Sequence, residues 1–428
     1  MSGRLLLELM GDWEGLKGPA LLGCVQAQPT GASEIFSVIW DEAALADAGL
    51  TTVDLDPQIP WGPGPHYPSS GRQTFGLLQD ISPDRWGRLL MERRRERARR
   101  AVQATAERLR ESDFLMGVHD HFRLGGIRLR RPEGGAWLSS DDERAAPPMV
   151  RLRQLEAACR AVEDDASDGD KLDEWLRLLI APGGSLGGAR PKASVVDERG
   201  AMWIAKFPSV RDTTDMGAWE LLATTLARAS GVQVPESWAR TFASVRHTYL
   251  VKRFDRTASG GRLHMASAMT LTGHQDGDGA DTGASYLELA DVIIRQGSEP
   301  HRDLGELWRR IVFNLLVSNT DDHLRNHAFL LDPGRGWRLA PAYDMNPDPS
   351  GKGLKLNISE VDNAPDLDLV AGVAAHFRVD KGAVSLEIAR MQKVVRSWPK
   401  LATRLGISKN EQERMAPAFR LAQPRLGG

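Results

Sequence analysis

The spacing of apolar residues predicts strands in the first half of the chain and helices in the second half. Residues 1–60 alternate short apolar runs with Gly, Pro and Asp turns, which is typical of a small antiparallel sheet. Two further strands, 193–196 and 202–206, are joined by a turn at 197–200 and form a predicted hairpin. Apolar residues three and four positions apart predict a helix at 304–316, and 216–230 is predicted to be an amphipathic helix. Further helices are expected at 151–163, 366–376, 381–395 and 409–421.

A helix start is predicted at Ser82, Pro83 and Asp84, where a hydroxyl cap, a proline and an acid stand together. This helix continues into 92–100, a basic segment whose interspersed Glu residues and lack of aromatics favour a solvated helix face over a nucleic-acid surface. The Asp- and Gly-rich segment 273–285 does not fit the calcium loop of an EF-hand, so we expect a mobile acidic loop there. Strands are expected at 121–131, 249–256 and 354–358.

Composition then narrows the class of protein. The chain has 428 residues, of which 41% are hydrophobic and 26% charged, which is ordinary for a soluble globular protein of two or three domains. A formal net charge of −2 gives no support to general polyanion binding. Cys24 and Cys159 lie far apart without metal-ligand spacing, which suits a reducing cytosol. Without a signal-peptide pattern or an apolar run of roughly 18–20 residues, we expect a cytoplasmic protein with no membrane partner.

The most informative segment, 311–344, places polar residues directly after an apolar helix. Asp321 and Asn326 have the D-x-x-x-x-N spacing of a kinase catalytic loop, in which the Asp takes the proton of the acceptor hydroxyl and the Asn binds magnesium. After a predicted strand pair, Asp344 stands where a kinase has its metal-binding Asp, and such oxygen ligands suit Mg²⁺. The alternative is a polar loop whose Asp and Asn cap helix ends, and it is stronger for Asp321 alone than for the whole set.

A glycine-rich segment precedes the predicted hairpin and reads Ala-Pro-Gly-Gly-Ser-Leu-Gly-Gly-Ala-Arg-Pro-Lys over 181–192. Glycines let backbone N–H groups approach a phosphate closely, and Lys206 on the returning strand would neutralise phosphate charge. The segment matches neither common phosphate-loop pattern, so alone it also fits a flexible approach to a hairpin. Glu220 could pair with Lys206, as a kinase helix glutamate does, or lie exposed in a first helical turn.

A strand-rich part with a glycine loop and a lysine, followed by a helical part with D-x-x-x-x-N and a metal Asp, predicts a bilobal, protein-kinase-like fold of the α/β (α+β) class. A charged, proline-bearing link at 139–148 predicts a domain boundary. We therefore expect an N-terminal domain at 1–140, a kinase N-lobe with the glycine-rich loop at 141–256, and a helical C-lobe at 257–428.

Three segments resemble the HipA family, the serine/threonine kinase toxins of bacterial toxin–antitoxin pairs. Residues 185–192 resemble the phosphate loop of that family, and 319–326 with 342–344 resemble its catalytic and metal motifs. The sequence Ser-Pro-Asp-Arg-Trp-Gly-Arg within 75–88 resembles the signature of its N-terminal domain. The resemblance spans nearly the whole chain and implies an ATP- and Mg²⁺-dependent kinase.

The resemblance also implies roles for single residues. Asp321 would be the catalytic Asp, His323 would structure the loop around it, and Asn326 and Asp344 would bind Mg²⁺. Ser185 matches the position at which the family autophosphorylates, which ejects the loop and silences the kinase. Lys252 and Phe254 fall at the hinge that meets the adenine, although Lys252 departs from the Glu of the best-known member. The implied nucleotide-binding residues are Gly184, Ser185, Gly187, Gly188, Lys192, Lys206, Lys252 and Phe254.

The family further implies a non-specific serine/threonine protein kinase that phosphorylates a protein serine. In the best-known case the target is glutamate–tRNA ligase, and its modification stalls translation and promotes dormancy and persistence. A helix-turn-helix antitoxin, similar to HipB, would bridge the kinase to operator DNA. Three alternatives stay open: a small-molecule kinase, a catalytically silent corepressor of the same fold, and a metal-dependent phosphohydrolase using Asp321, Asp322, His323 and Asp344.

Overall fold

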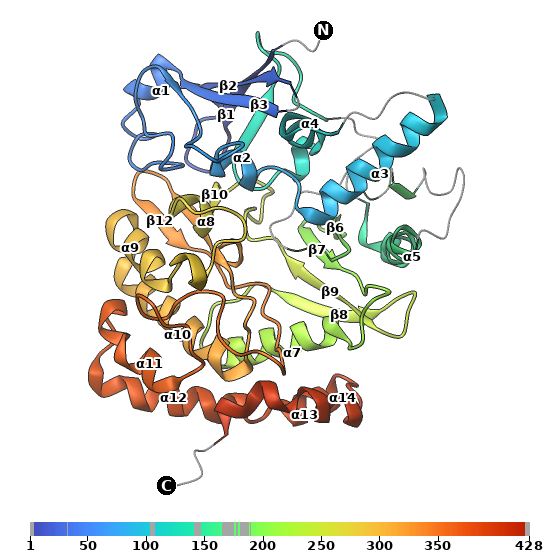
Figure 1. Cartoon of the computed structure of the whole chain (residues 1–428), viewed down its shortest axis with the longest axis vertical. Helices are drawn as coiled ribbons and strands as arrows, with labels where there is room; N and C mark the ends of the chain where they lie inside the picture. Colours follow the sequence, from blue (N-terminus) through green and yellow to red (C-terminus); the bar gives the residue numbers. More distant parts are fainter. Residues whose placement is uncertain are drawn as a thin grey trace. The chain divides into compact units, whose positions relative to one another are not determined.

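The computed structural model describes residues 4–31, 33–102, 108–140, 147–164, 175–176, 179, 188 and 190–423. The chain forms two compact units built from interleaved segments (Figure 1). Unit 1 contains Met1–Val210, Lys252–Ala266 and Leu330–Gly336, whereas unit 2 contains Arg211–Val251, Ser267–Phe329 and Trp337–Gly428. The mixed α/β class is confirmed, and the division into three consecutive domains stays a prediction.

Unit 1 begins with a five-stranded antiparallel sheet in the order β4-β3-β2-β1-β5. Its strands are β1 (Leu5–Gly11), β2 (Ala20–Thr30), β3 (Ser33–Trp40), β4 (Pro65–His66) and β5 (Ile127–Arg130). Leu7 and Leu9 of β1 are fully buried while Glu8 faces outward and pairs with Arg130 of β5, which is the alternation of a half-buried strand. The sheet predicted for 1–60 is confirmed, but the strand expected at 121–131 is confined to β5.

The helices of unit 1 are α1 (Glu42–Ala46), α2 (Gly76–Asp80), α3 (Arg85–Val102), α4 (Glu111–Gly117) and α5 (Leu152–Glu163). Asp84 caps α3, since its Oδ1 accepts a hydrogen bond of 2.8 Å from the backbone N–H of Gly87. Ser82 was predicted to be the cap, but its hydroxyl instead donates to the carbonyl of Leu78. The basic segment 92–100 lies on α3, where Arg99 and Arg100 pair with Glu96.

The hairpin predicted after the glycine-rich segment is present as β6 (Lys192–Val196) and β7 (Met202–Lys206). Its turn closes on Asp197, whose carbonyl accepts from the N–H of Gly200 and whose carboxylate accepts from Trp203 Nε1 at 2.9 Å. Gly200 adopts a φ of +80°, which a glycine reaches without strain. In this hairpin Lys192 and Lys206 stand directly opposite each other.

Most residues of unit 2 lie in helices, and the predominance of helices in the second half of the chain agrees with the prediction. Strand β8 (Ser237–Thr241) pairs with β9 (His247–Lys252), whose last residue belongs to unit 1. The boundary strands are β10 (Met265–Ser267), β11 (Ala328–Asp332) and β12 (Gly336–Leu339). The helices are α7 (Met216–Ala229), α8 (Ala268–Leu271), α9 (Tyr286–Gln296), α10 (Pro300–Val317), α11 (Leu367–Gly372), α12 (Lys381–Val395), α13 (Trp398–Arg404) and α14 (Lys409–Met415).

Helix α10 is the core of unit 2, and α9, α11 and α12 pack around it (Figure 1). The sequence predicted burial of one apolar face, but four polar residues of α10 are buried as well: Asp303, Glu306, Arg310 and Asn314. Asp303 accepts a hydrogen bond from the N–H of Leu339, and Glu306 accepts one from the N–H of Gln233. The polar side chains therefore hold neighbouring loops against the helix, because buried polar groups require partners.

In the last part of the chain, one prediction is wrong and one helix was missed. Residues 354–358 form no strand, although Leu354, Leu356 and Ile358 are buried in alternation. The bridge between Ser285 and Asn357 is isolated, and the other backbone hydrogen bonds of the segment join it to loops. The carbonyl of Lys355 accepts from the N–H of Ala280 at 2.8 Å, and the N–H of Ile358 donates to the carbonyl of Asp362 at 2.7 Å. The alternation of apolar residues in this extended segment is therefore what led to the wrong prediction of a strand. Helix α13 was not predicted.

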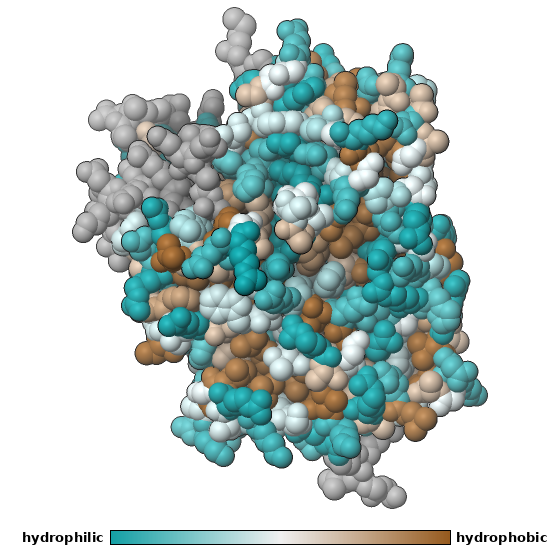
Figure 2. All heavy atoms as spheres, turned by 180° about the vertical axis from the view of Figure 1, so that it is seen from behind, coloured by the Kyte–Doolittle hydropathy of each residue, from teal (hydrophilic) through white to brown (hydrophobic). Residues whose placement is uncertain are grey.

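On the face shown in Figure 2, apolar residues are interspersed among hydrophilic ones. Single exposed apolar side chains are normal on a soluble protein. In the part of the chain that the structure describes, no helix is long and apolar enough to cross a membrane.

Candidate active site

The end of helix α10 fixes where the loop that carries Asp321 begins. Ser318 follows the last helical residue with a left-handed φ of +51°, which is unusual for a residue other than glycine. Its hydroxyl donates to the carbonyl of Ala418 at 2.7 Å, and the next N–H, that of Asn319, bonds to the carbonyl of Asn314 at 2.9 Å. These bonds hold the strained residue, so the loop leaves the helix in one direction.

The two consecutive aspartates of this loop lie in opposite environments. The Asp322 side chain is buried, and its Oδ2 accepts from the Tyr286 hydroxyl at 2.6 Å and from Asn314 Nδ2 at 2.7 Å. The same oxygen lies 2.7 Å from His327 Nε2, and the acceptor-only carboxylate places the imidazole proton on that nitrogen. Asp322 therefore holds the loop to α9 and α10, while Asp321 is exposed.

The surroundings of Asp321 raise the pKa of its carboxyl above the ordinary 3.8. Partial withdrawal from water is the largest cause, and the charges of Asp344 and Asp322 add to it, whereas His323 and Lys355 oppose it. The structure thus brings Asp321, His323 and Asp344 together, as the sequence predicted. Lys355 also belongs to this group, and sequence reasoning missed it.

A hydrogen bond from its own nitrogen orients the side-chain amide of Asn326. Nδ2 donates to the backbone carbonyl of Asp321 at 3.1 Å, which leaves Oδ1 buried without a hydrogen-bond partner. A buried oxygen without a donor fits a hard cation, and Mg²⁺ takes one or two protein oxygens together with waters and phosphate oxygens. The backbone of His323 completes the turn, because its carbonyl accepts from the N–H of Asn326 at 2.8 Å. Asn326 therefore fits the expected metal role.

Asp344 is held at a strained backbone position with a φ of +59°. Its Oδ1 accepts from Asn346 Nδ2 at 3.3 Å, and the backbone N–H of Asn346 donates to Asn319 Oδ1 at 3.1 Å. Asn319 Nδ2 in turn donates to Asn314 Oδ1 at 3.1 Å. We call Asn314, Asn319 and Asn346 the asparagine relay. It connects the segment of Asp344 to Asp322 through Asn314, and no spacing in the sequence pointed to these contacts.

The segment 273–285, expected to be a mobile acidic loop, is hydrogen-bonded throughout its length. His274 lies 3.1 Å from Asp278 and 3.0 Å from Glu288 through its two ring nitrogens. These carboxylates raise the pKa of His274 above 6.5, and the hydrogen bond with Glu288 is the largest cause. The N–H of Ala280 donates to the carbonyl of Lys355 at 2.8 Å. The loop therefore supports the backbone of Lys355, whose positive charge lowers the pKa of Asp321.

The nucleotide-binding residues predicted in unit 1 are only partly described. Gly184, Ser185 and Gly187 lie outside the described residues. Gly188 has a left-handed φ of +79°, which suits glycine. Lys206 ends β7 with a half-buried side chain. Lys192 is buried, and its ammonium lies 3.0 Å from the carboxylate of Asp84, a contact that sequence reasoning missed.

The predicted hinge segment alternates in burial. Arg253 and Asp255 are buried, whereas Lys252 and Phe254 are half-buried, so the two pairs point to opposite sides of an extended chain. The ammonium of Lys252 lies 5.9 Å from the centre of the Trp203 ring, within reach of a cation–π interaction. Lys252 and Phe254 are thus kept apart from the interior of unit 1.

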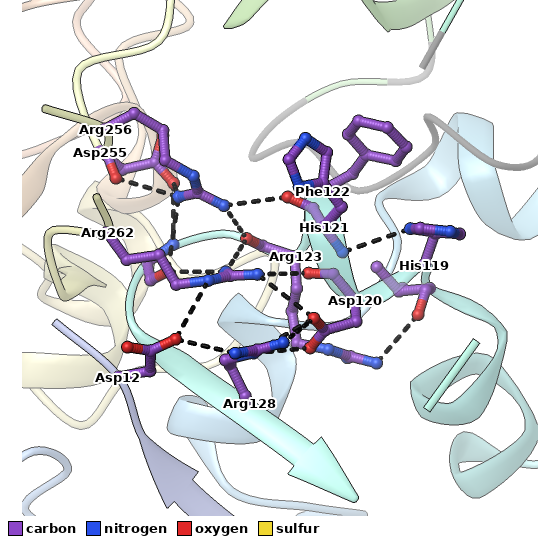
Figure 3. A network of polar contacts seen from close by, with 12 residues as sticks. Asp12, His119, Asp120, His121, Phe122, Arg123, Arg128, Asp255, Arg256 and Arg262 are labelled. Carbon is purple, nitrogen blue, oxygen red and sulfur yellow. Dashed lines mark hydrogen bonds and ion pairs between the residues drawn. The ribbon is translucent and has the colours of Figure 1, made fainter. Parts of the chain in front are cut away.

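A buried ionic network holds the other side of that segment (Figure 3). Asp255 accepts from Arg253, Arg256 and the N–H of Gly125. Burial alone would raise the pKa of Asp255, but the charges of Arg253 and Arg256 hold it well below its usual range. Arg262 extends the network by donating to the carbonyl of Asp120 at 2.6 Å. The hinge segment is therefore fixed to residues 120–125 of unit 1.

Glu220 is buried on α7, with 5% of its surface exposed, which excludes the exposed first-turn glutamate left open by the sequence. Its pairing with Lys206, which belongs to unit 1, stays a prediction. Among the described residues, no three His, Cys, Asp or Glu are grouped as a metal site.

The chain is similar to two curated proteins whose names contain the word kinase. It is 30% identical over 157 residues to "Putative kinase Y4dM" of Sinorhizobium fredii, a match that covers 34% of this chain and 37% of the relative. It is 30% identical over 124 residues to "Putative kinase" of Haemophilus influenzae, which covers 27% and 36% respectively. The matched stretches thus span little more than a third of these relatives.

The fold is similar along nearly the whole chain to that of a solved structure, the Shewanella oneidensis toxin–antitoxin complex of HipA, HipB and operator DNA. The TM-score is 0.59 at 17% identity, and the similarity covers 97% of this chain and 95% of that one. The expected fold class is therefore confirmed. Residues 184–416, more than half of the chain, match the model of the HipA-like C-terminal domain. The chain belongs to the family of proteins with a HipA-like C-terminal domain.

Proposed function

We propose that the protein is a serine/threonine protein kinase that transfers the γ-phosphate of ATP to a serine of another protein. One observation carries this proposal: the catalytic loop buries Asp322 as an anchor and leaves Asp321 exposed, close to Asp344. The loop also presents the unpartnered oxygen of Asn326. An accessible carboxylate beside two oxygen ligands is what phosphoryl transfer from a magnesium-bound nucleotide requires.

Asp321 would accept the proton of the serine hydroxyl and orient its oxygen toward the γ-phosphate. Its raised pKa suits this role, because a proton acceptor works best when its pKa lies nearer the working pH. Asn326 and Asp344 would hold Mg²⁺, which when bound neutralises phosphate charge. Lys206 and the backbone of Gly184, Gly187 and Gly188 would contact the phosphates, and the backbone at Lys252 and Phe254 would contact the adenine.

A metal-dependent phosphohydrolase is less consistent with the structure. It would use Asp322 together with Asp321 and Asp344, but the Asp322 carboxylate is buried and already bonded to Tyr286 and Asn314. A small-molecule kinase shares every catalytic residue and differs in the acceptor alone. A silent corepressor would retain the fold without transfer.

In the cell we propose that the protein is the cytoplasmic toxin of a toxin–antitoxin pair. The supporting observation is the similarity to HipA, whose structure was solved with HipB and operator DNA. A helix-turn-helix antitoxin would then be the partner, and it would supply most of the affinity for DNA, because the net charge of −2 gives this chain little attraction to phosphates. The protein substrate would be an aminoacyl-tRNA synthetase such as glutamate–tRNA ligase, so that phosphorylation inhibits translation and promotes persistence.

The test is mass spectrometry of bacterial extract incubated with the protein and magnesium-ATP, with the Asp321→Ala variant as the matched control. A new phosphoserine on one or a few proteins, absent with the variant, supports the protein kinase. Phosphate found on small molecules alone would favour the small-molecule kinase, and no transfer to any acceptor would favour the corepressor.

We also propose that the kinase autophosphorylates at Ser185. A phosphate there adds nearly two negative charges, which would repel the phosphates of the nucleotide and silence the enzyme. Intact-mass measurement after incubation with magnesium-ATP tests this, with Ser185→Ala as the control. Absence of added phosphate, or phosphate confined to other residues, would rule out the switch.

A further inference from the structure

We infer that Asp84, at the start of α3, is a positioning residue for the nucleotide site, because it holds Lys192 at the end of the glycine-rich segment. This inference rests on the proposed kinase function. It changes the role expected for Lys192 from a direct phosphate ligand to an anchor, and it makes the N-terminal part of the chain a determinant of nucleotide affinity.

The ion pair between the two residues is buried. Lys192 Nζ lies 3.0 Å from Asp84 Oδ2, and only 6% and 2% of the two side-chain surfaces are exposed. Charge-assisted hydrogen bonds are strong where water is excluded, so the ammonium has little freedom to leave the carboxylate. The same ammonium lies 3.4 Å from the backbone carbonyl of Gly188. Through Lys192, Asp84 is therefore linked to the glycine-rich backbone itself.

The two carboxylate oxygens of Asp84 make different contacts. Oδ1 accepts from the backbone N–H of Gly87 and caps α3 at 2.8 Å, while Oδ2 faces Lys192. The cap fixes the carboxylate to the first turn of an 18-residue helix. Lys192 is thus held by a rigid support, and this ion pair links the start of β6 to the start of α3.

The hairpin explains why a counter-charge is needed here. Lys192 and Lys206 are opposite residues of antiparallel strands, so their side chains leave the same face of the sheet. Two unpaired ammonium groups at such positions repel each other. The carboxylate of Asp84 beside Lys192 offsets this repulsion, so the start of β6 stays in register with the end of β7.

The experiment measures the affinity of the full chain for magnesium and a non-hydrolysable ATP analogue by calorimetry. The variants are Asp84→Asn, which keeps an oxygen for the α3 cap but removes the charge, Lys192→Gln, and the two combined. We expect each single change to weaken binding by about tenfold, the scale of one lost charge-assisted hydrogen bond, and the double variant to bind no worse than either single one.

A matched control is Glu111→Gln. It breaks the ion pair that Glu111 forms at 2.6 Å with Arg88 of the same helix, without touching Lys192. Its thermal stability should fall while its nucleotide affinity stays at the wild-type value. A purely structural role of Asp84 would give the same pattern for Asp84→Asn, and that result would overturn the inference.

Further outcomes separate this inference from the proposed function. If the wild-type protein binds no magnesium nucleotide, the proposed function fails. If wild type binds but Lys192→Gln binds equally well, or the two single effects simply add, only the inference fails. Should Asp84→Asn not fold, Lys192→Gln and Lys192→Arg decide: recovery of affinity with the arginine, which can still pair with Asp84, supports the anchor, and equal weakening in both contradicts it.

Discussion

The hydroxyl of Tyr286 donates a hydrogen bond of 2.6 Å to Oδ2 of Asp322, one residue beyond the proposed catalytic Asp321. Tyr286 is the first residue of α9, and it is fully buried. Burial and the neighbouring carboxylate raise the pKa of the tyrosine well above its usual value, so it stays a donor throughout the physiological range. This hydrogen bond holds Asp322 in the interior, whereas the neighbouring Asp321 remains exposed.

The first prediction concerns this anchor. Tyr286→Phe should lower the free energy of unfolding by about 1–3 kcal/mol, because it leaves a buried carboxylate with one donor fewer. Denaturant unfolding followed by fluorescence measures the change. Asp321→Asn is the control: its side chain is exposed, and removal of a charge near Asp344 should leave stability unchanged or slightly increased. Equal losses in the two variants would contradict the division of roles.

The second prediction concerns chemistry. Asp321→Ala should reduce phosphoryl transfer by about 10²–10⁴-fold, the usual contribution of a positioned proton acceptor. Affinity for magnesium-ATP should change little, because Asp321 orients the acceptor and does not hold the nucleotide. Transfer of radiolabelled phosphate and calorimetric binding check the two quantities separately. Near-wild-type transfer would show that Asp321 is not the base.

The third prediction concerns the asparagine relay. Asn346→Ala removes a hydrogen bond to the Asp344 carboxylate, so the Mg²⁺ concentration needed for half-maximal nucleotide binding should rise by about tenfold, as is typical when a residue that orients a metal ligand is lost. Asp344→Ala, which removes the ligand itself, should weaken binding more. Asn363→Ala is the matched control, since the Asn363 side chain donates to the backbone carbonyl of Leu354 in the same unit. A magnesium titration in which Asn346→Ala behaves like Asn363→Ala would show that Asp344 needs no such support.

Local patterns were enough to predict the candidate site, because the residues proposed for it lie close together in sequence. The five-residue spacing of Asp321 and Asn326 and the apolar period of α10 were both readable without the fold. The residues that hold these segments in place could not be predicted from the sequence, because they come from distant parts of the chain. Tyr286 is 36 residues from Asp322, and Gly125 is 130 residues from Asp255. A polar contact between distant residues leaves no periodic pattern.

The same reasoning explains the errors. The burial of Leu354, Leu356 and Ile358 in alternation has the period of a strand, but a strand also needs a hydrogen-bonded partner, which no local pattern reports. The acidic composition of 273–285 suggested mobility, because the ion pairs of His274 with Asp278 and Glu288 could not be seen without the fold.

The last prediction concerns Asp56, a fully buried aspartate of unit 1. Its carboxylate accepts from the N–H groups of Leu77 and Gln58, both at 2.9 Å. Burial nevertheless raises its pKa from 3.8 to about 6, and the charge of Asp80 adds to the shift. The folded protein therefore binds this proton more tightly than the unfolded chain does.

The sign of the pH effect follows from this difference. Below pH 4 both states are protonated at Asp56, and the folded state has its full stability from this group. As the pH rises from about 4 to about 6, the unfolded chain releases the proton first, so the free energy of unfolding falls, by about 3 kcal/mol in total. Above that range Asp56 contributes no further change.

Because other groups titrate too, the quantity to measure is the stability difference between wild type and Asp56→Asn, by urea unfolding at pH 4, 5, 6 and 7. From pH 4 to 6 the free energy of unfolding of the variant should rise relative to that of wild type. A constant difference from pH 4 to 7 would show that burial does not shift the pKa of Asp56.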